Sequence, residues 1–187
     1  MPDVELVNII GMLDFHRELE LSAVADLLKS SDLVSEVNYS PEENHWLQTR
    51  FKFNGGSKYV AFYRSGSSAL VGCSSFGQLN QLEELVKTAM EPVIRDPPTL
   101  EIKNLVCVGE LNQNIDLTHL AIAVGLEKVE YEPEQFPGLI YRGDESDPVF
   151  LVFASGKVVI TGATTIEAAN QSFQDFTEKF AEWGFRD

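Results

Sequence analysis

Val129-Glu-Tyr-Glu-Pro-Glu-Gln-Phe-Pro-Gly-Leu-Ile-Tyr-Arg142 is the stretch that decides the fold, because the first half of the chain contains a weaker copy of it. The copy runs Val37-Asn-Tyr-Ser-Pro-Glu-Glu-Asn-His-Trp-Leu-Gln-Thr-Arg50, with valine, tyrosine, proline, glutamate, leucine and arginine at equal spacing. Further along, Ser65-Gly66 corresponds to Ser155-Gly156. A period of about half the chain implies two related subdomains rather than a solenoid.

Both halves predict the same order of elements. Each begins with an apolar β-branched run, followed by a leucine-rich helix, three or four short strands and a long amphipathic helix. The expected ranges are 4–13, 19–29, 35–39, 46–53, 58–64, 67–73 and 77–91, then 100–109, 115–126, 128–132, 138–142, 149–154, 157–163 and 165–183. Pro97 and Pro98 stop a helix and extend the chain between the halves. We therefore predict repeats at 1–95 and 96–187.

This order of elements predicts an α+β fold with a largely antiparallel sheet and helices on one face. Strands such as 149–153 are apolar at successive positions, so both of their faces are apolar. Helices can cover only one of these faces. The other face is expected to be an exposed apolar sheet, which is typical of a binding surface.

The composition is acidic. Fourteen Lys and Arg residues against 29 Asp and Glu residues leave a net charge of -15. Taken alone, this charge argues against nucleic-acid binding, which normally uses a basic surface, and it suits a solvated surface at high salt. Net charge does not decide the chemistry of a local site, however. The sequence predicts no membrane span and no signal peptide. Cys73 and Cys107 are expected to be buried, reduced thiols of an intracellular protein.

The second-half motif resembles the second repeat of the TATA-box-binding protein family. The resemblance rests on Tyr131–Arg142 and on Val152-Phe-Ala-Ser-Gly-Lys-Val-Val-Ile-Thr-Gly-Ala163. It covers residues 98–184 well and residues 4–92 as a divergent first repeat. The resemblance implies a saddle, with ten antiparallel strands curved over the DNA minor groove and four helices on the convex face. This family is itself a standard example of minor-groove bending by inserted apolar side chains. The compact, acidic chain is similar to archaeal members.

The resemblance implies a set of DNA-contacting and supporting residues in the second repeat. They are Phe136 and Phe153 as the aromatic pair that enters a base step, Leu139 as its support, Asn104 as a donor to minor-groove acceptors, Val106, Val159 and Thr161 as a small apolar floor, and Arg142 and Lys157 as phosphate contacts. Such a floor fits an A·T minor groove, where the guanine amino group would collide. Ordinary core packing is the alternative for each residue taken alone.

The first repeat departs from this pattern. The positions that it keeps or partly keeps are Asn8, Leu47, Arg50 and Tyr63. Asn44 stands where Phe136 would have its mate, Tyr63 answers Phe153, and Ser67 answers Lys157. Trp46 replaces Gly138 and offers an aromatic ring at a different position of the loop. The sequence therefore predicts a sharp DNA kink at the second-repeat end and a shallow or absent one at the first-repeat end.

An acidic segment in the second repeat matches the surface on which transcription factor B docks in the family. Its residues are Glu132, Glu134 and Gln135; a solvated charge run is the alternative interpretation. The implied function is that of a general transcription factor that bends A·T-rich promoter DNA and recruits transcription factor B and then RNA polymerase. It would act at the chromosome, in the cytoplasm of an archaeal cell or in the nucleus of a eukaryotic one. The alternative is a regulatory paralogue that binds protein partners and has little DNA binding of its own.

Catalysis finds no support in the sequence. His16, His45 and His119 lie apart, with no nucleophile and no carboxylate placed to orient them. Metal ligands do not cluster. We therefore expect no enzymatic activity, no cofactor and no metal site.

Overall fold

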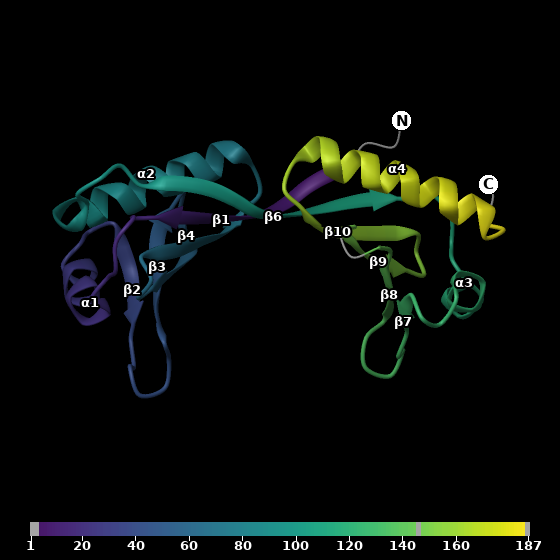
Figure 1. Ribbon diagram of the computed structural model, residues 1–187, viewed down its shortest axis with the longest axis horizontal. Coiled ribbons are helices and arrows are strands. Elements are labelled where there is room, and N and C mark those ends of the chain that lie inside the picture. Colours follow the sequence, from purple (N-terminus) through teal and green to yellow (C-terminus); the bar gives the residue numbers. More distant parts are fainter. Residues whose placement is uncertain (1–3, 145–146, 186–187) are drawn as a thin grey trace. The chain divides into compact units, whose positions relative to one another are not determined.

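The computed structural model describes residues 4–144 and 147–185, which form ten strands, four α-helices and one short 3-10 helix (Figure 1). The elements, in chain order, are β1 (Glu5–Asp14), α1 (Leu21–Lys29), β2 (Val34–Asn38), β3 (Trp46–Phe53), β4 (Gly56–Tyr63), β5 (Ser67–Cys73), α2 (Phe76–Met90), η1 (Glu91–Val93), β6 (Thr99–Glu110), α3 (Leu117–Val124), β7 (Val129–Glu130), β8 (Gly138–Arg142), β9 (Val149–Phe153), β10 (Lys157–Ala163) and α4 (Ile166–Glu182). The strand order is β2-β3-β4-β5-β1-β6-β10-β9-β8-β7. This arrangement confirms the predicted α+β fold.

The chain divides into two compact units. The first-half unit comprises residues 8–103, and the second-half unit comprises the described parts of 1–7 and 104–187. Each of the long strands β1 and β6 therefore begins in one unit and ends in the other. The repeat boundary between residues 95 and 96 concerns the duplication of the sequence, and it stays a prediction.

In the first-half unit, α2 packs closely against the sheet. A Cβ built on Gly11 of β1 would lie 3.1 Å from a δ-carbon of Leu79 in α2, so only a hydrogen atom fits between the strand and the helix. Phe51 and Phe62, on the neighbouring strands β3 and β4, are fully buried. These contacts make one face of the first-half sheet its core.

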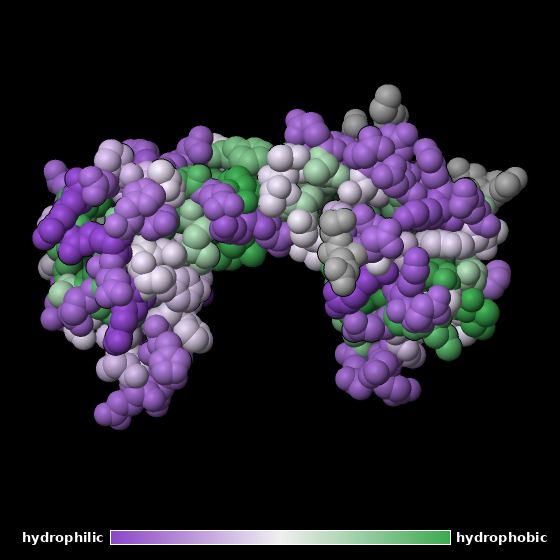
Figure 2. All heavy atoms as spheres, viewed as in Figure 1, coloured by the Kyte–Doolittle hydropathy of each residue, from purple (hydrophilic) through white to green (hydrophobic). Residues whose placement is uncertain are grey.

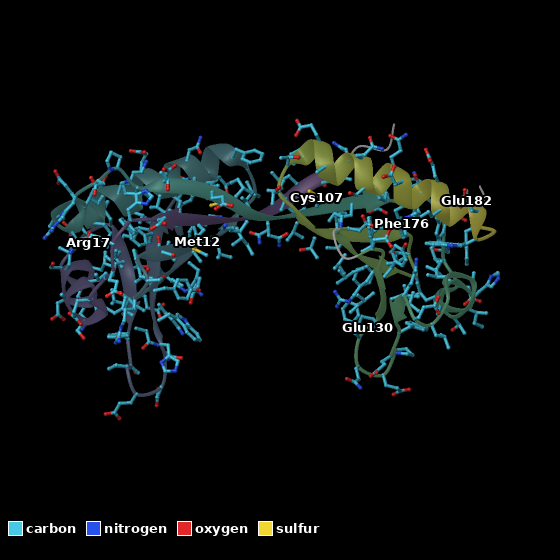
Figure 3. All side chains as sticks on the ribbon, in the orientation of Figure 1. Met12, Arg17, Cys107, Glu130, Phe176 and Glu182 are labelled. Carbon is cyan, nitrogen blue, oxygen red and sulfur yellow. The ribbon has the colours of Figure 1, made fainter. Side chains whose placement is uncertain are left out.

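In the second-half unit, α4 supplies the aromatic core. The ring of Phe176 lies 4.6 Å from that of Phe150, at an interplanar angle of 13°, and 5.7 Å from that of Tyr141. A Cβ at Gly109 would lie 2.4 Å from the ring of Phe173, which explains the glycine near the end of β6. Figure 3 shows Phe176 between α4 and the strands beneath it. Offset and tilted ring contacts of this kind add to the area that burial removes from water.

Side-chain oxygens cap the helices where the sequence predicted helix starts. Thr165 accepts a hydrogen bond from the amide of Ala168 (3.1 Å), and Asp116 accepts one from His119 (3.0 Å). Glu20 accepts from the amides of Ala23 (2.6 Å) and Ser22 (3.2 Å). The bonds from Ala23 and Ser22 lower the pKa of the Glu20 carboxyl, because they stabilise its charged form. The expected helix at 19–29 therefore begins at Leu21 rather than at residue 19.

The sheet of each unit has a helix face and an open face. Along β6, Leu105 and Cys107 are buried, while Asn104, Val106 and Val108 between them are only half-buried. The same alternation in β1 buries Leu13 and leaves Met12 half-buried; Figure 3 shows Met12 on the side of β1 away from α2. We call the buried side the helix face and the other side the open face. Half-buried apolar side chains on the open face agree with the predicted binding surface.

Both cysteines are free and buried, as predicted. Burial raises the pKa of the Cys73 and Cys107 thiols, because a thiolate in an apolar core loses its hydration. No helix within the described ranges is long and apolar enough to cross a membrane. Among the described residues, no group of three or more His, Cys, Asp and Glu side chains is placed to hold a metal ion.

Candidate nucleic-acid interface

The open face of the second-half unit brings together most of the second-repeat residues predicted from the sequence. Thr161 of β10 lies opposite Val106 of β6, and Val159 lies opposite Val108. On the other side of β10, Val159 pairs with Leu151 of β9. These residues form a continuous strip of short, mostly β-branched side chains. Val108 and Leu151 were not predicted from the sequence, although strict alternation along β6 and β9 places them on this face.

Asn104 is held in this strip by a bulge in β10. The β6–β10 register shifts between Thr161 and Ala163, and Gly162 between them has a φ of 111°, a conformation that favours glycine. The bulge frees the amide of Gly162, which donates to Oδ1 of Asn104 at 2.7 Å. Nδ2 of Asn104 donates to Oγ1 of Thr161 at 2.9 Å. These bonds assign the orientation of the Asn104 amide and leave a second Nδ2 hydrogen for a ligand.

The first-half unit repeats the bulge but not the whole network. Gly72 has a φ of 92°, and its amide donates to Oδ1 of Asn8 at 3.1 Å. Val71 stands where Thr161 stands in the second half, so no hydroxyl is available there to the Asn8 amide group. The two asparagines therefore share a backbone setting and differ in their side-chain neighbours.

The aromatic pair of the second half is assembled. The rings of Phe136 and Phe153 lie 5.8 Å apart in an edge-to-face arrangement at 66°. Phe153 pairs across the strands with Gly138. A Cβ on Gly138 would lie 2.8 Å from Cε1 of Phe136 and 3.2 Å from Cε1 of Phe153. The glycine is therefore required for the two rings to sit as they do.

In the first half, Tyr63 is half-buried and pairs across the strands with Trp46. Asn44 precedes Trp46 in the loop and lines a surface hollow together with Tyr39, Pro41, His45 and Arg64. The open face includes Tyr63, Trp46 and Arg50. Trp46 pairs with Tyr63, and Arg50, four residues along β3, pairs with Tyr59. Residues at alternate positions of paired strands lie on the same face. The face has aromatic side chains in both halves, carried by different loop positions.

Leu139 and Leu47 lie beneath the open face. Both are 0% exposed. Leu139 pairs with Val152, and Leu47 pairs with Phe62, both of which are buried on the helix face. Because successive strand residues point to opposite faces, both leucines lie on the side away from the open face. Leu139 can support the aromatic pair only from beneath the sheet, as the resemblance implied.

Each predicted phosphate-binding arginine already has an acidic neighbour. Nε of Arg142 lies 3.1 Å from a carboxylate oxygen of Glu130, and Nε of Arg50 lies 3.6 Å from one of Glu36. Lys157 is exposed and pairs across the strands with Glu110. Figure 3 shows Glu130 on the strands below α4. Exposed ion pairs are weak, so these cations are available to a phosphate at a small cost.

The acidic loop between β7 and β8 is exposed at Glu132, Glu134 and Gln135. Nε2 of Gln135 donates to the carboxylate of Glu132, and the amides of Gln135 and Phe136 bond to the carbonyl of Glu132. Glu134 at the turn has its carboxylate in solvent. Figure 2 shows hydrophilic atoms at the tip of this loop and of its first-half counterpart. The segment is therefore an ordered anionic surface.

The three histidines lie in three different settings. His119 packs its ring 5.0 Å from that of Phe185, and His16 bonds to Thr99 through Nε2 at 3.2 Å. His45 lines the hollow of the first-half loop. The three imidazoles have structural neighbours of their own and form no common site among the described residues.

Comparisons with known proteins agree with this arrangement. A family model described as transcription factor TFIID, or TATA-binding protein (TBP), matches residues 99–183. TATA-box-binding protein C of Halobacterium salinarum is 40% identical over 184 residues, covering 96% of this chain and 98% of the relative. The TATA-box-binding protein of Haloarcula marismortui is 32% identical over 187 residues, covering 98% and 96%.

The solved structure of Methanococcus jannaschii TBP matches with a TM-score of 0.79 and 27% identity, covering 97% of this chain and 99% of that one. This match confirms the predicted saddle fold and the internal repeat. The family model, by contrast, reaches only the second half, where the sequence motif is well preserved. The relatives are archaeal, as the resemblance implied. The chain therefore belongs to the TATA-box-binding protein family.

Proposed function

We propose that this protein is a general transcription initiation factor that binds A·T-rich promoter DNA through the minor groove and bends it. The open face of the second-half unit carries the proposal: a strip of short apolar side chains with Asn104 in it and the Phe136–Phe153 pair beside it. Short side chains allow close approach to a minor-groove floor without an amino group, which means A·T rather than G·C pairs. The relatives named TATA-box-binding proteins support the same function.

Bending follows from the aromatic pair. Unstacking a base step costs roughly a few kcal/mol, and insertion of an apolar ring together with the wider contact of bent DNA offsets that cost. Phe136 and Phe153 are already in contact before any ligand arrives, so little side-chain entropy is lost on binding. The free Nδ2 hydrogen of Asn104 would donate to N3 of adenine or O2 of thymine.

Partner recruitment is assigned to the acidic loop. Glu132 and Glu134 are exposed in the loop between β7 and β8. We propose that transcription factor B docks here through basic residues and then brings RNA polymerase. The hydrogen bonds that order the loop support a docking role over a solvated charge run, because an ordered surface loses less entropy on binding. The protein would act on the chromosome in the cytoplasm of an archaeal cell.

One observation favours the second candidate, a regulatory paralogue with weak DNA binding of its own. Both arginines on the open face are paired with glutamates, and the net charge is -15. Such a protein would bind its protein partner without any promoter DNA present.

A gel-shift experiment separates the two candidates. A duplex with an A·T-rich element and a scrambled duplex are compared across a salt series, with and without transcription factor B. We expect selective binding to the A·T-rich duplex and a further shift with transcription factor B. Equal binding to both duplexes, or binding of transcription factor B alone, would favour the regulatory paralogue.

A further inference from the structure

The loops that precede β3 and β8 have the same backbone. In the second half, the amides of Gln135 and Phe136 bond to the carbonyl of Glu132 at 2.9 and 3.0 Å. In the first half, the amides of Glu43 and Asn44 bond to the carbonyl of Ser40 at 3.0 and 2.8 Å. Asn44 and Trp46 therefore occupy the same backbone positions as Phe136 and Gly138.

The side chains at these two positions have been exchanged in size. Phe136 fits beside Phe153 only because residue 138 has no Cβ, since a Cβ there would lie 2.8 Å from the Phe136 ring. A larger residue at the second position would therefore force a phenylalanine at the first position out of this place. The first half has the reverse combination, a small polar residue at the first position and an indole at the second.

Trp46 is placed to take over the role of the missing phenylalanine. It is the first residue of β3 and lies opposite Tyr63, as Gly138 lies opposite Phe153. Trp46 is half-buried, and strand alternation puts it on the open face with Gln48 and Arg50. An indole offers a larger stacking surface than a phenyl ring, and its N–H can donate to a groove acceptor.

We propose that Trp46 and Tyr63 form the base-contacting aromatic pair of the first half, equivalent to Phe136 and Phe153. This inference rests on the proposed function, minor-groove binding of A·T-rich DNA. It replaces the expectation of a shallow kink at the first-repeat end. The first half thus keeps an aromatic wedge, carried by a residue two positions further along the chain, at the start of β3.

Fluorescence tests the contact directly. Trp46 and Trp183 are the only tryptophans, and Trp183 lies on the helix side, 5.4 Å from the ring of Tyr141. In a Trp183→Phe variant, Trp46 is the single reporter. We expect an A·T-rich duplex to quench its emission strongly, because stacking on bases quenches an indole. The matched Trp46→Phe variant, which reports from Trp183, should change little. A saturating duplex that leaves the Trp46 emission unchanged would overturn the proposal.

Affinity and bending give an independent readout. Trp46→Ala should weaken binding to the A·T-rich duplex roughly tenfold or more and reduce the bend measured by energy transfer, whereas Trp46→Phe should keep most of both. The double variant Asn44→Phe/Trp46→Gly rebuilds the second-half arrangement and should rescue the bend. The single variant Asn44→Phe keeps Trp46 and should bend the duplex no more than the wild type does, because the two large rings compete for one space. Melting temperatures would identify any variant that fails to fold.

The outcomes separate this proposal from the function on which it rests. If the wild type binds selectively and Phe153→Ala loses binding while Trp46→Ala does not, only the role of Trp46 is wrong. If the wild type shows no selective binding, both proposals fail. Loss in Trp46→Ala that the double variant rescues supports both.

Discussion

The two halves of the molecule have one backbone and two chemistries. The loops 39–45 and 131–137 repeat each other's hydrogen bonds, and the bulges at Gly72 and Gly162 both present an amide to an asparagine. The side chains differ where each loop meets the next strand: one half has an asparagine and a tryptophan, and the other has a phenylalanine and a glycine. A repeat can therefore keep its fold while a different residue carries the contact.

The asparagine pair shows the same division. Asn104 is held by the Gly162 amide and by the Thr161 hydroxyl, whereas Asn8 is held by the Gly72 amide, and Val71 stands at the position of Thr161. Both settings leave an amide hydrogen for a ligand, but the second-half amide is more fully oriented. The halves would therefore read the two ends of a DNA element with different strictness.

Removing an aromatic side chain from each half should show the largest difference in DNA affinity between the two halves. Phe153→Ala should reduce affinity for an A·T-rich duplex about 100-fold, because it removes a base contact and the packing partner of Phe136. Tyr63→Ala should reduce the same affinity only about tenfold, because Trp46 remains opposite residue 63. Energy transfer across a labelled duplex measures the bend in both variants. Equal losses would mean that the two ends contribute alike.

The loops should differ in partner recruitment. Reversing charge at Glu132 and Glu134 should weaken capture of transcription factor B about 30-fold or more, because docking surfaces concentrate their binding energy in few residues. The matched control reverses Glu42 and Glu43 in the first-half loop, which are equally exposed. Supershift of a preformed DNA complex measures recruitment, and binary DNA binding should be intact or slightly improved. A parallel loss of DNA binding would assign the second-half pair to loop shape instead.

The side-chain neighbour of each asparagine can be exchanged by a single substitution. Thr161→Val keeps the β-branched shape and removes the hydroxyl that receives Nδ2 of Asn104, so affinity should fall about two- to tenfold. Val71→Thr adds the matching hydroxyl beside Asn8 and should raise it by a similar factor. Competition titration with duplexes substituted at single base pairs measures both. No change in either variant would make the asymmetry irrelevant to binding.

The ion pairs should produce the smallest effect. Glu130→Gln frees Arg142 from a 3.1 Å contact and should raise DNA affinity about two- to threefold, with less from Glu36→Gln at 3.6 Å. Because the surface is acidic, affinity should fall only slightly with added salt, or rise as repulsion is screened. Titrations between low and high salt measure both effects. A steep loss with salt in the wild type would indicate many free phosphate contacts.

Several features were predictable from the sequence because they depend on local chemistry. The internal repeat gave the order of elements, and alternating apolar residues gave the strands. Thr165 was recognisable as a cap because its hydroxyl needs only an amide three residues away. Boundaries moved by a few residues; for example, the strand expected at 128–132 is reduced to Val129–Glu130, because a turn begins at Glu132.

Other features were decided only by the tertiary structure. Leu139 and Leu47 lie in motifs whose other residues lie on the open face, and cross-strand register puts these two leucines on the helix face. The glutamates beside Arg50 and Arg142 come from neighbouring strands, so no local pattern announces these ion pairs. The link between the loop position of Phe136 and the glycine at 138 is also a matter of packing. A Cβ on Gly138 would lie 2.8 Å from the Phe136 ring, so Trp46 at the equivalent position of the first half does not suit a phenylalanine at position 44. Sequence determines which residues can alternate and cap, whereas only packing across strands decides which side chains meet.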